Sequence, residues 1–339
     1  MASLTETAFI TRKTLSIGVI LLVLLIVARI IIGFSASLWQ KFFPPPPPPP
    51  TLAFGRLPYP NAENNLATPS GNISYTLETP DGGFPKLPPT VKVYFMPAAT
   101  PSFGSFDKMK ATANGLGFTD IPVRVGPTTW KFTDKDNPLR TLDIDEVSQN
   151  FHLVYGYQSD LSLFNDKNFT SAEQVIASAQ SFFTSLKDGR PSVYYYKLDA
   201  GGLVPTTALA NADGVGVSLA RPEIDGLPVV SPDWRQGLYS ILYSGASDQK
   251  KKILEARYFA AAIDLQNWAT YPLISAADAF EKLKSRQAIF ASLVTSQNIT
   301  IRKVYLAYLD PYPAQRYLQP VLVFSDEKGF VAYVPIVSQ

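Results

Sequence analysis

The chain has no cysteine, and its only histidine is His152. The lack of cysteine excludes disulfides, thiolate zinc sites, iron–sulfur clusters and cysteine nucleophiles. A Ser-His-Asp triad or a histidine-rich metal site would depend on His152 alone. This residue lies in NFHLVYGY, whose alternation predicts a strand, so we interpret it as a structural or surface histidine.

A strong charge of either sign is also missing. The chain has 30 basic and 28 acidic residues, a net charge of +2, and its densest basic run is only KKK at Lys250–Lys252. Nucleic-acid binding requires concentrated Lys and Arg, so no nucleic-acid partner is predicted. Apolar residues make up 46% of the chain and aromatic residues 12%, which is enough for a well-buried core.

Motifs for phosphate or calcium binding are weak. The glycines of DAGGL and DGVGV lack the lysine that follows a phosphate-binding loop, and no G-x-S-x-G nucleophile motif is present. DKDN at Asp134–Asn137 starts like a calcium loop. Pro138 and Leu139 then stand where an EF-hand needs a ligand and a glycine. A hairpin turn is therefore favoured over a weak calcium site.

The stretch LDIDE forms an acidic cluster of Asp143, Asp145 and Glu146. Two carboxylates that flank a scissile bond could serve a glycosidase, but residues at i and i+2 only share one face of a strand. Solvated surface charge is the favoured interpretation. We predict no enzyme activity, with no catalytic, cofactor-binding or metal-ligating residues.

A long apolar run is present near the N-terminus. It extends from Thr14 to Trp39 with Arg29 as its only charge, and about 20 apolar residues suffice to span a bilayer. Arg12 and Lys13 precede it, so the positive-inside rule places residues 1–13 in the cytoplasm. The run predicts a single-pass signal-anchor helix over 14–39 and an extracytoplasmic remainder. A cleaved signal peptide, ending near FSAS, is the alternative.

Seven consecutive prolines, Pro44–Pro50, follow this run. Proline fixes φ and lacks an N–H donor, so the run predicts a polyproline II rod roughly 22 Å long. The segment 40–73 continues rich in Pro, Asn and Gly. We interpret it as an extended stalk, with a PxxP ligand for an SH3-like partner as the alternative.

From residue 74, three predicted helices alternate with groups of strands. The helices are SFDKMKATANGLGF, then TSAEQVIASAQSFFTSLKDG with Thr170 and Glu173 in capping-box spacing, then SAADAFEKLKSR with Ser275 and Asp278 in the same pattern. The similar openings of the last two indicate a repeated unit. We expect an α+β fold of helix-plus-antiparallel-sheet modules over 74–165, 166–270 and 271–339.

Tyrosine is dense in VYYYKL and in YLAYLDPYPAQRYL. Tyrosine combines a flat apolar ring with a polar tip, which suits peptide or glycan binding, although alternate tyrosines also simply cover a sheet. The prolines of the second stretch predict an exposed loop. The candidate binding surface comprises Tyr194, Tyr196, Tyr308, Tyr312, Arg316 and Tyr317.

Residues 268–337 contain a TYPLIS lead into an AxxxL helix, followed by VYLAYLDP and LQPVLVF strands. This part resembles the ectodomain of YycH/YycI-type regulators, single-pass proteins that modulate a cell-wall-sensing histidine kinase. The helix-then-strands repeats also resemble PepSY modules of protease propeptides and membrane-anchored regulators.

The resemblance implies a membrane-anchored, extracytoplasmic regulatory protein whose partner is an envelope or membrane protein such as a sensor kinase. An inhibitor or chaperone of an envelope protease is an alternative. A cell-wall glycan binder, or a hydrolase that uses Asp143 or Asp145, is another.

Overall fold

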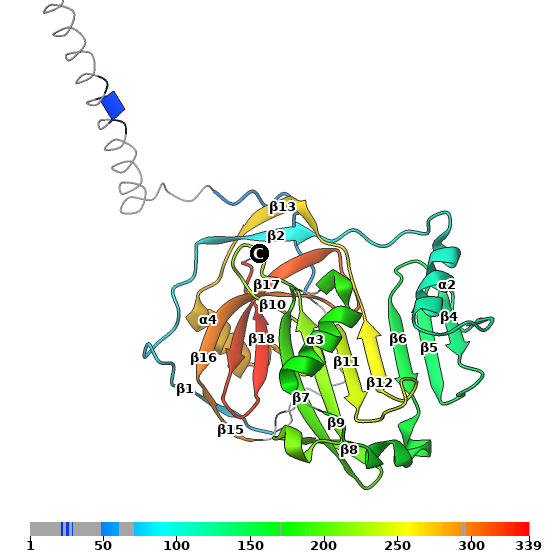
Figure 1. Cartoon of the computed structure of the whole chain (residues 1–339). Helices are drawn as coiled ribbons and strands as arrows, with labels where there is room; N and C mark the ends of the chain where they lie inside the picture. Colours follow the sequence, from blue (N-terminus) through cyan, green and yellow to red (C-terminus); the bar gives the residue numbers. More distant parts are fainter. Residues whose placement is uncertain are drawn as a thin grey trace, which may run out of the picture. The chain divides into compact units, whose positions relative to one another are not determined.

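The computed structural model describes residues 22, 25–26, 29, 49–60, 71–169, 171–186, 188–292, 294 and 296–338. The chain divides into two compact units, Met1–Pro49 and Pro50–Gln339. In the first unit, the described residues at positions 22, 25, 26 and 29 are helical. The second unit contains all the labelled strands and helices of Figure 1.

The predicted membrane anchor is not supported. Residues 1–13 and most of 14–39 lie outside the described residues. Among the residues that are described, no helix has both the length and the apolar character needed to cross a membrane. The single-pass anchor, and the cell-membrane localisation inferred from it, are therefore corrected.

The second unit is mainly β. Its described residues form eighteen strands and three α-helices, α2 (Ser105–Gly115), α3 (Ala172–Phe182) and α4 (Ala276–Lys284). All three helices fall where the hydrophobic periodicity predicts them. The expected α+β fold of repeated helix-plus-sheet modules is nevertheless wrong, because the strands greatly outnumber the helices and join into large sheets.

The larger sheet has nine strands in the order β3-β4-β5-β6-β12-β11-β9-β7-β8. Adjacent strands run antiparallel throughout. The hairpin predicted at Asp134 is confirmed: it joins the antiparallel strands β4 and β5. The N–H of Asp134 donates to the carbonyl of Arg140 at 3.1 Å and closes the turn. The bounds are β3 Val123–Arg124, β4 Thr129–Thr133, β5 Arg140–Asp145, β6 Phe151–Tyr155, β7 Arg190–Asp199, β8 Gly202–Thr206, β9 Gly214–Ala220, β11 Tyr239–Ser244 and β12 Ile253–Tyr258.

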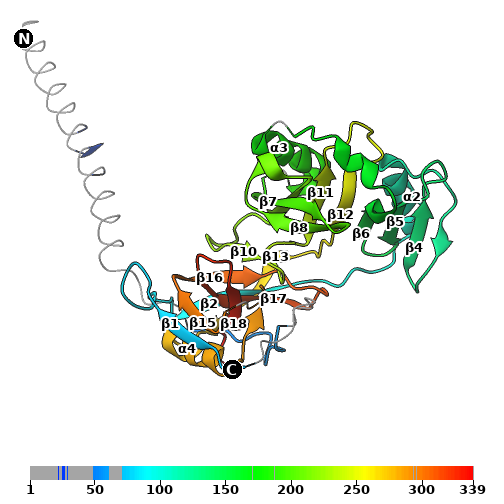
Figure 2. The same ribbon diagram turned by 90° about the horizontal axis from the view of Figure 1, so that it is seen from below.

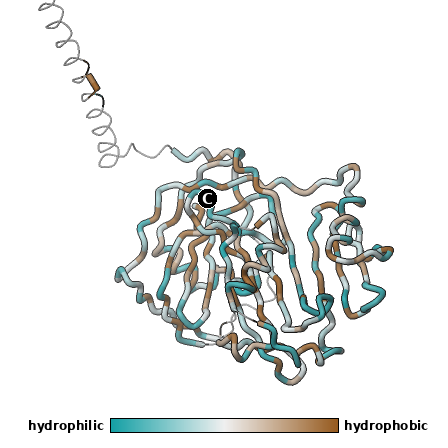
Figure 3. Tube along the Cα trace, viewed as in Figure 1, coloured by the Kyte–Doolittle hydropathy of each residue, from teal (hydrophilic) through white to brown (hydrophobic). Residues whose placement is uncertain are grey.

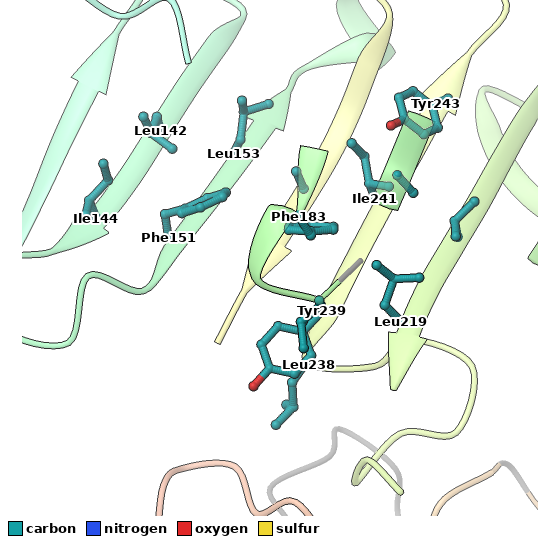
Figure 4. Close-up of a cluster of buried hydrophobic side chains, with 14 of the residues drawn as sticks. Leu142, Ile144, Phe151, Leu153, Phe183, Leu219, Leu238, Tyr239, Ile241 and Tyr243 are labelled. Carbon is teal, nitrogen blue, oxygen red and sulfur yellow. The ribbon is translucent and has the colours of Figure 1, made fainter. Parts of the chain in front are cut away.

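One face of this sheet carries its hydrophobic core. Alternate residues of the strands point to this face, and α2 and α3 contribute Met109 and Ala179 to the same cluster. Figure 4 shows the side chains along neighbouring strands. Helix α3 starts at the N-cap Ser171, whose hydroxyl accepts from the N–H of Gln174. The predicted cap, Thr170, is one residue earlier and lies outside the described residues.

The second sheet has seven strands, with β10-β16-β17-β18-β14 along one path and β2 joining β17 to β13. Helix α4 covers one face of it and starts at the predicted N-cap, Ser275. Hydrophobic and hydrophilic residues alternate along strands of both sheets (Figure 3). The bounds are β2 Thr90–Phe95, β10 Val229–Val230, β13 Asp264–Pro272, β14 Ile289–Phe290, β16 Lys303–Leu309, β17 Tyr317–Ser325 and β18 Val331–Pro335, and a separate parallel pair is β1 Ser74–Leu77 with β15 Asn298–Ile301.

Strand β17 contains a proline although it is buried. Along one edge of β17, Tyr317 and Leu318 pair with β2, and the residues from Val321 onwards pair with β18. Pro320 lies between the two partners, where a missing N–H breaks neither ladder.

The sheets do not follow the predicted modules. β6, from the predicted module 74–165, pairs with β12, from the module 166–270. β2, also from the first module, pairs with β13 and β17. The chain thus starts the second sheet with β2 and then builds the nine-stranded sheet, visiting the second sheet once at β10. It returns to finish the second sheet from β13 onwards. In Figure 2, α2 and α3 lie on the side of the nine-stranded sheet that faces away from the second sheet.

Part of the predicted stalk belongs to the folded unit. Leu57 is buried, and the ring of Phe54 stacks on Tyr317 with centroids 4.9 Å apart. The phenol of Tyr271 donates to the carbonyl of Gly55 at 2.9 Å. Residues 50–60 are therefore packed on the second sheet, which corrects an extended stalk over all of 40–73. Residues 61–70 lie outside the described residues.

Candidate functional site

The nine-stranded sheet has a second face, opposite its core, with small residues at its centre. Ser218 pairs with Ser192 on one side and Ser240 on the other, and the next row places Gly216 beside Tyr194. A Cβ at Gly216 would lie only 3.2 Å from the ring of Tyr196. The glycine therefore lets this ring lie close to the sheet, and the serines leave a shallow polar floor.

A loop at residues 231–237 crosses this floor and is held by both sheets. Tyr194 of β7 donates its phenol proton to the carbonyl of Trp234 at 3.0 Å. Tyr333 of β18 donates in the same way to the carbonyl of Ser231 at 2.9 Å. The N–H of Gly237 donates to the hydroxyl of Ser218 at 2.9 Å. These bonds fix the loop, and with it the position of the indole.

A tight turn of the second sheet approaches the same loop. Asp326 accepts from the N–H groups of Lys328 at 2.8 Å and Phe330 at 2.7 Å, which closes the turn between β17 and β18. Gly329 adopts a φ of +100°, and a Cβ there would lie 3.4 Å from the indole of Trp234. The left-handed backbone favours glycine at this position, and a Cβ would make only an ordinary van der Waals contact with the indole.

These elements enclose a cleft between the two sheets. One pocket of about 460 Å³ is lined by Tyr196, Trp234, Arg235, Asn298, Arg302 and Lys328, among others. A second pocket of about 620 Å³ shares Trp234 and the 326–329 turn with it and extends to Arg190, Tyr194, Lys303 and Tyr305. The two pockets adjoin at Trp234 and this turn, and we refer to them together as the groove. The groove has an aromatic lining and polar groups at its rim, the usual character of a ligand site.

Glu255 is the best-connected acid on the floor. Its carboxylate bonds to His152 at 2.8 Å, accepts from Arg257 at 2.6 Å and accepts from Gln236 at 3.3 Å. Burial alone would raise the pKa of Glu255, but the His152 hydrogen bond and the Arg257 charge outweigh it, so the pKa lies below its ordinary value. The strand position predicted for His152 is confirmed, in β6.

The two tyrosines of β7 stay protonated at neutral pH. Burial raises the pKa of Tyr194 and of Tyr196 above the ordinary value of a phenol. Each therefore offers an O–H group and an apolar ring, and neither adds a negative charge to the groove.

The structure separates the six residues of the predicted binding surface. Tyr194 and Tyr196 lie in the cleft. Tyr308 is fully buried, and Tyr312 stacks on Phe259 with ring centroids 4.7 Å apart. The other two lie away from both pockets, since Tyr317 is buried against Phe54 and Arg316 is exposed beside the Tyr317 ring.

Trp234, Arg235 and Lys328 were missed from the sequence. The stretch SPDWRQG carried a signal, because a tryptophan between proline and glycine has no strand or helix in which to bury its ring. The turn bearing Lys328 has no comparable signal, since its sequence, SDEKG, is that of an ordinary exposed turn.

The acidic cluster of LDIDE serves a turn. Asp145 accepts from the N–H groups of Val147 at 3.1 Å and Ser148 at 2.7 Å, and Glu146 accepts from the indole of Trp130 at 2.9 Å. In the part of the chain that the structure describes, no three His, Cys, Asp or Glu side chains gather where they could hold a metal ion.

No known protein family matches this chain, and no curated protein is significantly similar to it. The resemblance of residues 268–337 to YycH/YycI-type regulators therefore stays a prediction. The case for a function depends on the cleft.

Proposed function

We propose that the protein is a non-enzymatic binding protein that holds an extended segment of a partner protein in the cleft, and so regulates that partner. The observation that carries the proposal is the aromatic lining of Tyr194, Tyr196 and Trp234 on a groove between two sheets. Tyr and Trp are the residues most enriched at protein-binding hot spots, because they offer large rigid surfaces with a polar handle.

The edge of β7 adds a reason to expect a peptide. Residues Arg190–Tyr196 pair with β9 on one side, but β8 pairs only with Tyr195–Asp199 on the other. Within the described residues, Arg190–Tyr194 thus has no strand on its outer side. Pro191 has no N–H to donate, so an extended peptide could add there through the remaining backbone groups of this edge, while its side chains enter the groove.

A binding role also suits the polar groups of the floor. Glu255 is engaged by His152 and Arg257 at hydrogen-bond distance, so these three residues bind one another and stabilise the sheet. The regulatory part of the proposal draws on the resemblance to YycH/YycI-type regulators, which act by binding another protein. An inhibitor of a protease is the alternative that the resemblance to PepSY modules implies.

A random peptide library selected on the purified full chain tests this proposal. The selected peptides should bind the wild type, and Tyr196→Ser should weaken them by about tenfold or more, the usual loss at an aromatic hot spot. Phe103→Ser is the matched control, because Phe103 is fully exposed and belongs to neither pocket. Failure to select any peptide, or equal affinity for wild type and Tyr196→Ser, would contradict the proposal.

A further inference from the structure

Basic side chains without acidic partners lie along the cleft. Arg190 and Lys303 line one pocket, and Arg235 and Lys328 line the other. All four are exposed, and in the described part of the chain none of them forms an ion pair. Arg302, the fifth basic residue of the groove, pairs with Glu78 at 3.0 Å.

The acids nearby are mostly engaged by the backbone. Asp233 accepts from the N–H groups of Arg235 at 2.9 Å and Gln236 at 3.1 Å. Asp326 closes its turn in the same way. Glu327, which is exposed, is the third acid that lines the two pockets. Glu255 of the floor is already engaged by Arg257 and His152. Five basic and three acidic residues line the two pockets, so basic residues outnumber acidic ones around the groove, and the four unpaired cations are available to a ligand.

The cations stand beside the aromatic surface. The guanidinium of Arg235 lies 5.2 Å from the ring centroid of Trp234, and Lys328 lies in the turn whose Gly329 approaches the same indole. A guanidinium held against an aromatic ring presents its N–H groups outward in a fixed plane, which suits a carboxylate. The Trp234 end of the groove thus combines an apolar platform with two positive charges.

We infer that the segment bound in the cleft is acidic, with carboxylate side chains that meet Arg235 and Lys328 at one end and Arg190 and Lys303 at the other. This inference rests on the proposed function and specifies its partner, an extended Asp- or Glu-bearing segment of a protein. The open edge of β7 favours a polypeptide over another polyanion, because only a polypeptide can continue the sheet.

Matched peptides test the charge preference on the full chain. Three peptides have the same apolar residues at the same positions and differ only at the remaining positions, which carry Glu in one peptide, Gln in the second and Lys in the third. Their affinities for the protein are measured by fluorescence anisotropy. At about 50 mM salt the Glu peptide should bind at least about tenfold more tightly than the Gln peptide, and the gap should shrink at about 500 mM because salt screens exposed charges.

Variants locate the effect. Arg235→Gln with Lys328→Gln should weaken the Glu peptide by about tenfold and leave the Gln peptide unchanged. Lys108→Gln with Lys135→Gln is the control, since it removes two exposed positive charges outside both pockets. Equal binding of the Glu and Gln peptides would overturn the inference and leave the proposed function standing. If an oligouronate binds and none of the three peptides does, both are wrong.

Discussion

Arg221 and Asp310 form an ion pair that ties the two sheets together. Arg221 directly follows β9 of the nine-stranded sheet, and Asp310 directly follows β16 of the second sheet. Nε of Arg221 donates to Oδ2 of Asp310 at 2.6 Å, and the side chains are only 16% and 3% exposed. The same guanidinium donates to the carbonyl of Ala261 at 2.6 Å, so it also holds the connection between β12 and β13.

Removing one partner of this pair should be costly. Asp310→Ala would leave the guanidinium buried beside the ring of Tyr239, 5.4 Å away, without its counter-charge. We expect the free energy of unfolding in urea to fall by about 3–5 kcal/mol. The double variant Arg221→Met with Asp310→Leu should lose less than the two single changes together, because it leaves no unpaired charge. A loss below about 1 kcal/mol for Asp310→Ala would show that the pair does not hold the sheets.

Gly245 lies where no side chain fits. It follows β11, and a Cβ there would collide with the carbonyl oxygen of Asp166 and lie 2.8 Å from the backbone nitrogen of Asn168. Gly245→Ala must push two backbone segments apart, so we expect a loss of about 1–3 kcal/mol in urea unfolding.

Gly83→Ala is the matched control for this change. A Cβ at Gly83 would meet nothing within 4 Å, so this substitution should be neutral or slightly stabilising. Equal effects of the two substitutions would rule out the close approach at Gly245.

Local elements could be predicted from the sequence because their signals are local. The three helices follow from apolar residues at helical spacing and from the capping serine at 275, and most strands follow from alternation. The order of strands in a sheet carries no such signal. In the sequence, all the strands of the nine-stranded sheet lie between β2 and β13. A module prediction based on neighbours in the chain could therefore not find their pairing.

The same reason explains which site residues were found. Tyr194 and Tyr196 share one face of β7, as alternation predicts, and that face lines the cleft. Tyr308 and Tyr317 belong to strands that are buried on both faces at these positions, where alternation cannot tell a core residue from a surface one. Arg235 and Lys328 line the same pocket only because the 231–237 loop and the turn between β17 and β18 come together at Trp234.

The N-cap of α4 can be tested directly. The hydroxyl of Ser275 accepts from the N–H of Asp278 at 3.1 Å and donates to its carboxylate at 2.7 Å. Ser275→Ala should lower the free energy of unfolding by about 1 kcal/mol, whereas Ser275→Thr keeps a hydroxyl and should lose much less. Equal losses in urea unfolding would show that the cap does not stabilise the helix.

Acid stability should depend on Asp160. Its carboxylate accepts from Lys251 at 2.7 Å, Ser162 at 2.6 Å and Tyr155 at 2.7 Å. These bonds, the one from Lys251 above all, hold the pKa of Asp160 far below its ordinary value. A lowered pKa in the folded state stabilises the protein above the unfolded pKa of about 3.9, and this stabilisation is lost as the pH falls towards the folded pKa.

Asp160→Asn should therefore cost about 1–3 kcal/mol at pH 7, the usual contribution of hydrogen bonds to a charged group, and the cost should shrink as the pH falls below about 4. The measurement is urea unfolding at a series of pH values between about 7 and 2. Asp199→Asn serves as the control, since Asp199 is exposed and has no ion pair among the described residues. A cost for Asp160→Asn that is the same at every pH would mean that the variant loses packing and not the charged hydrogen bonds.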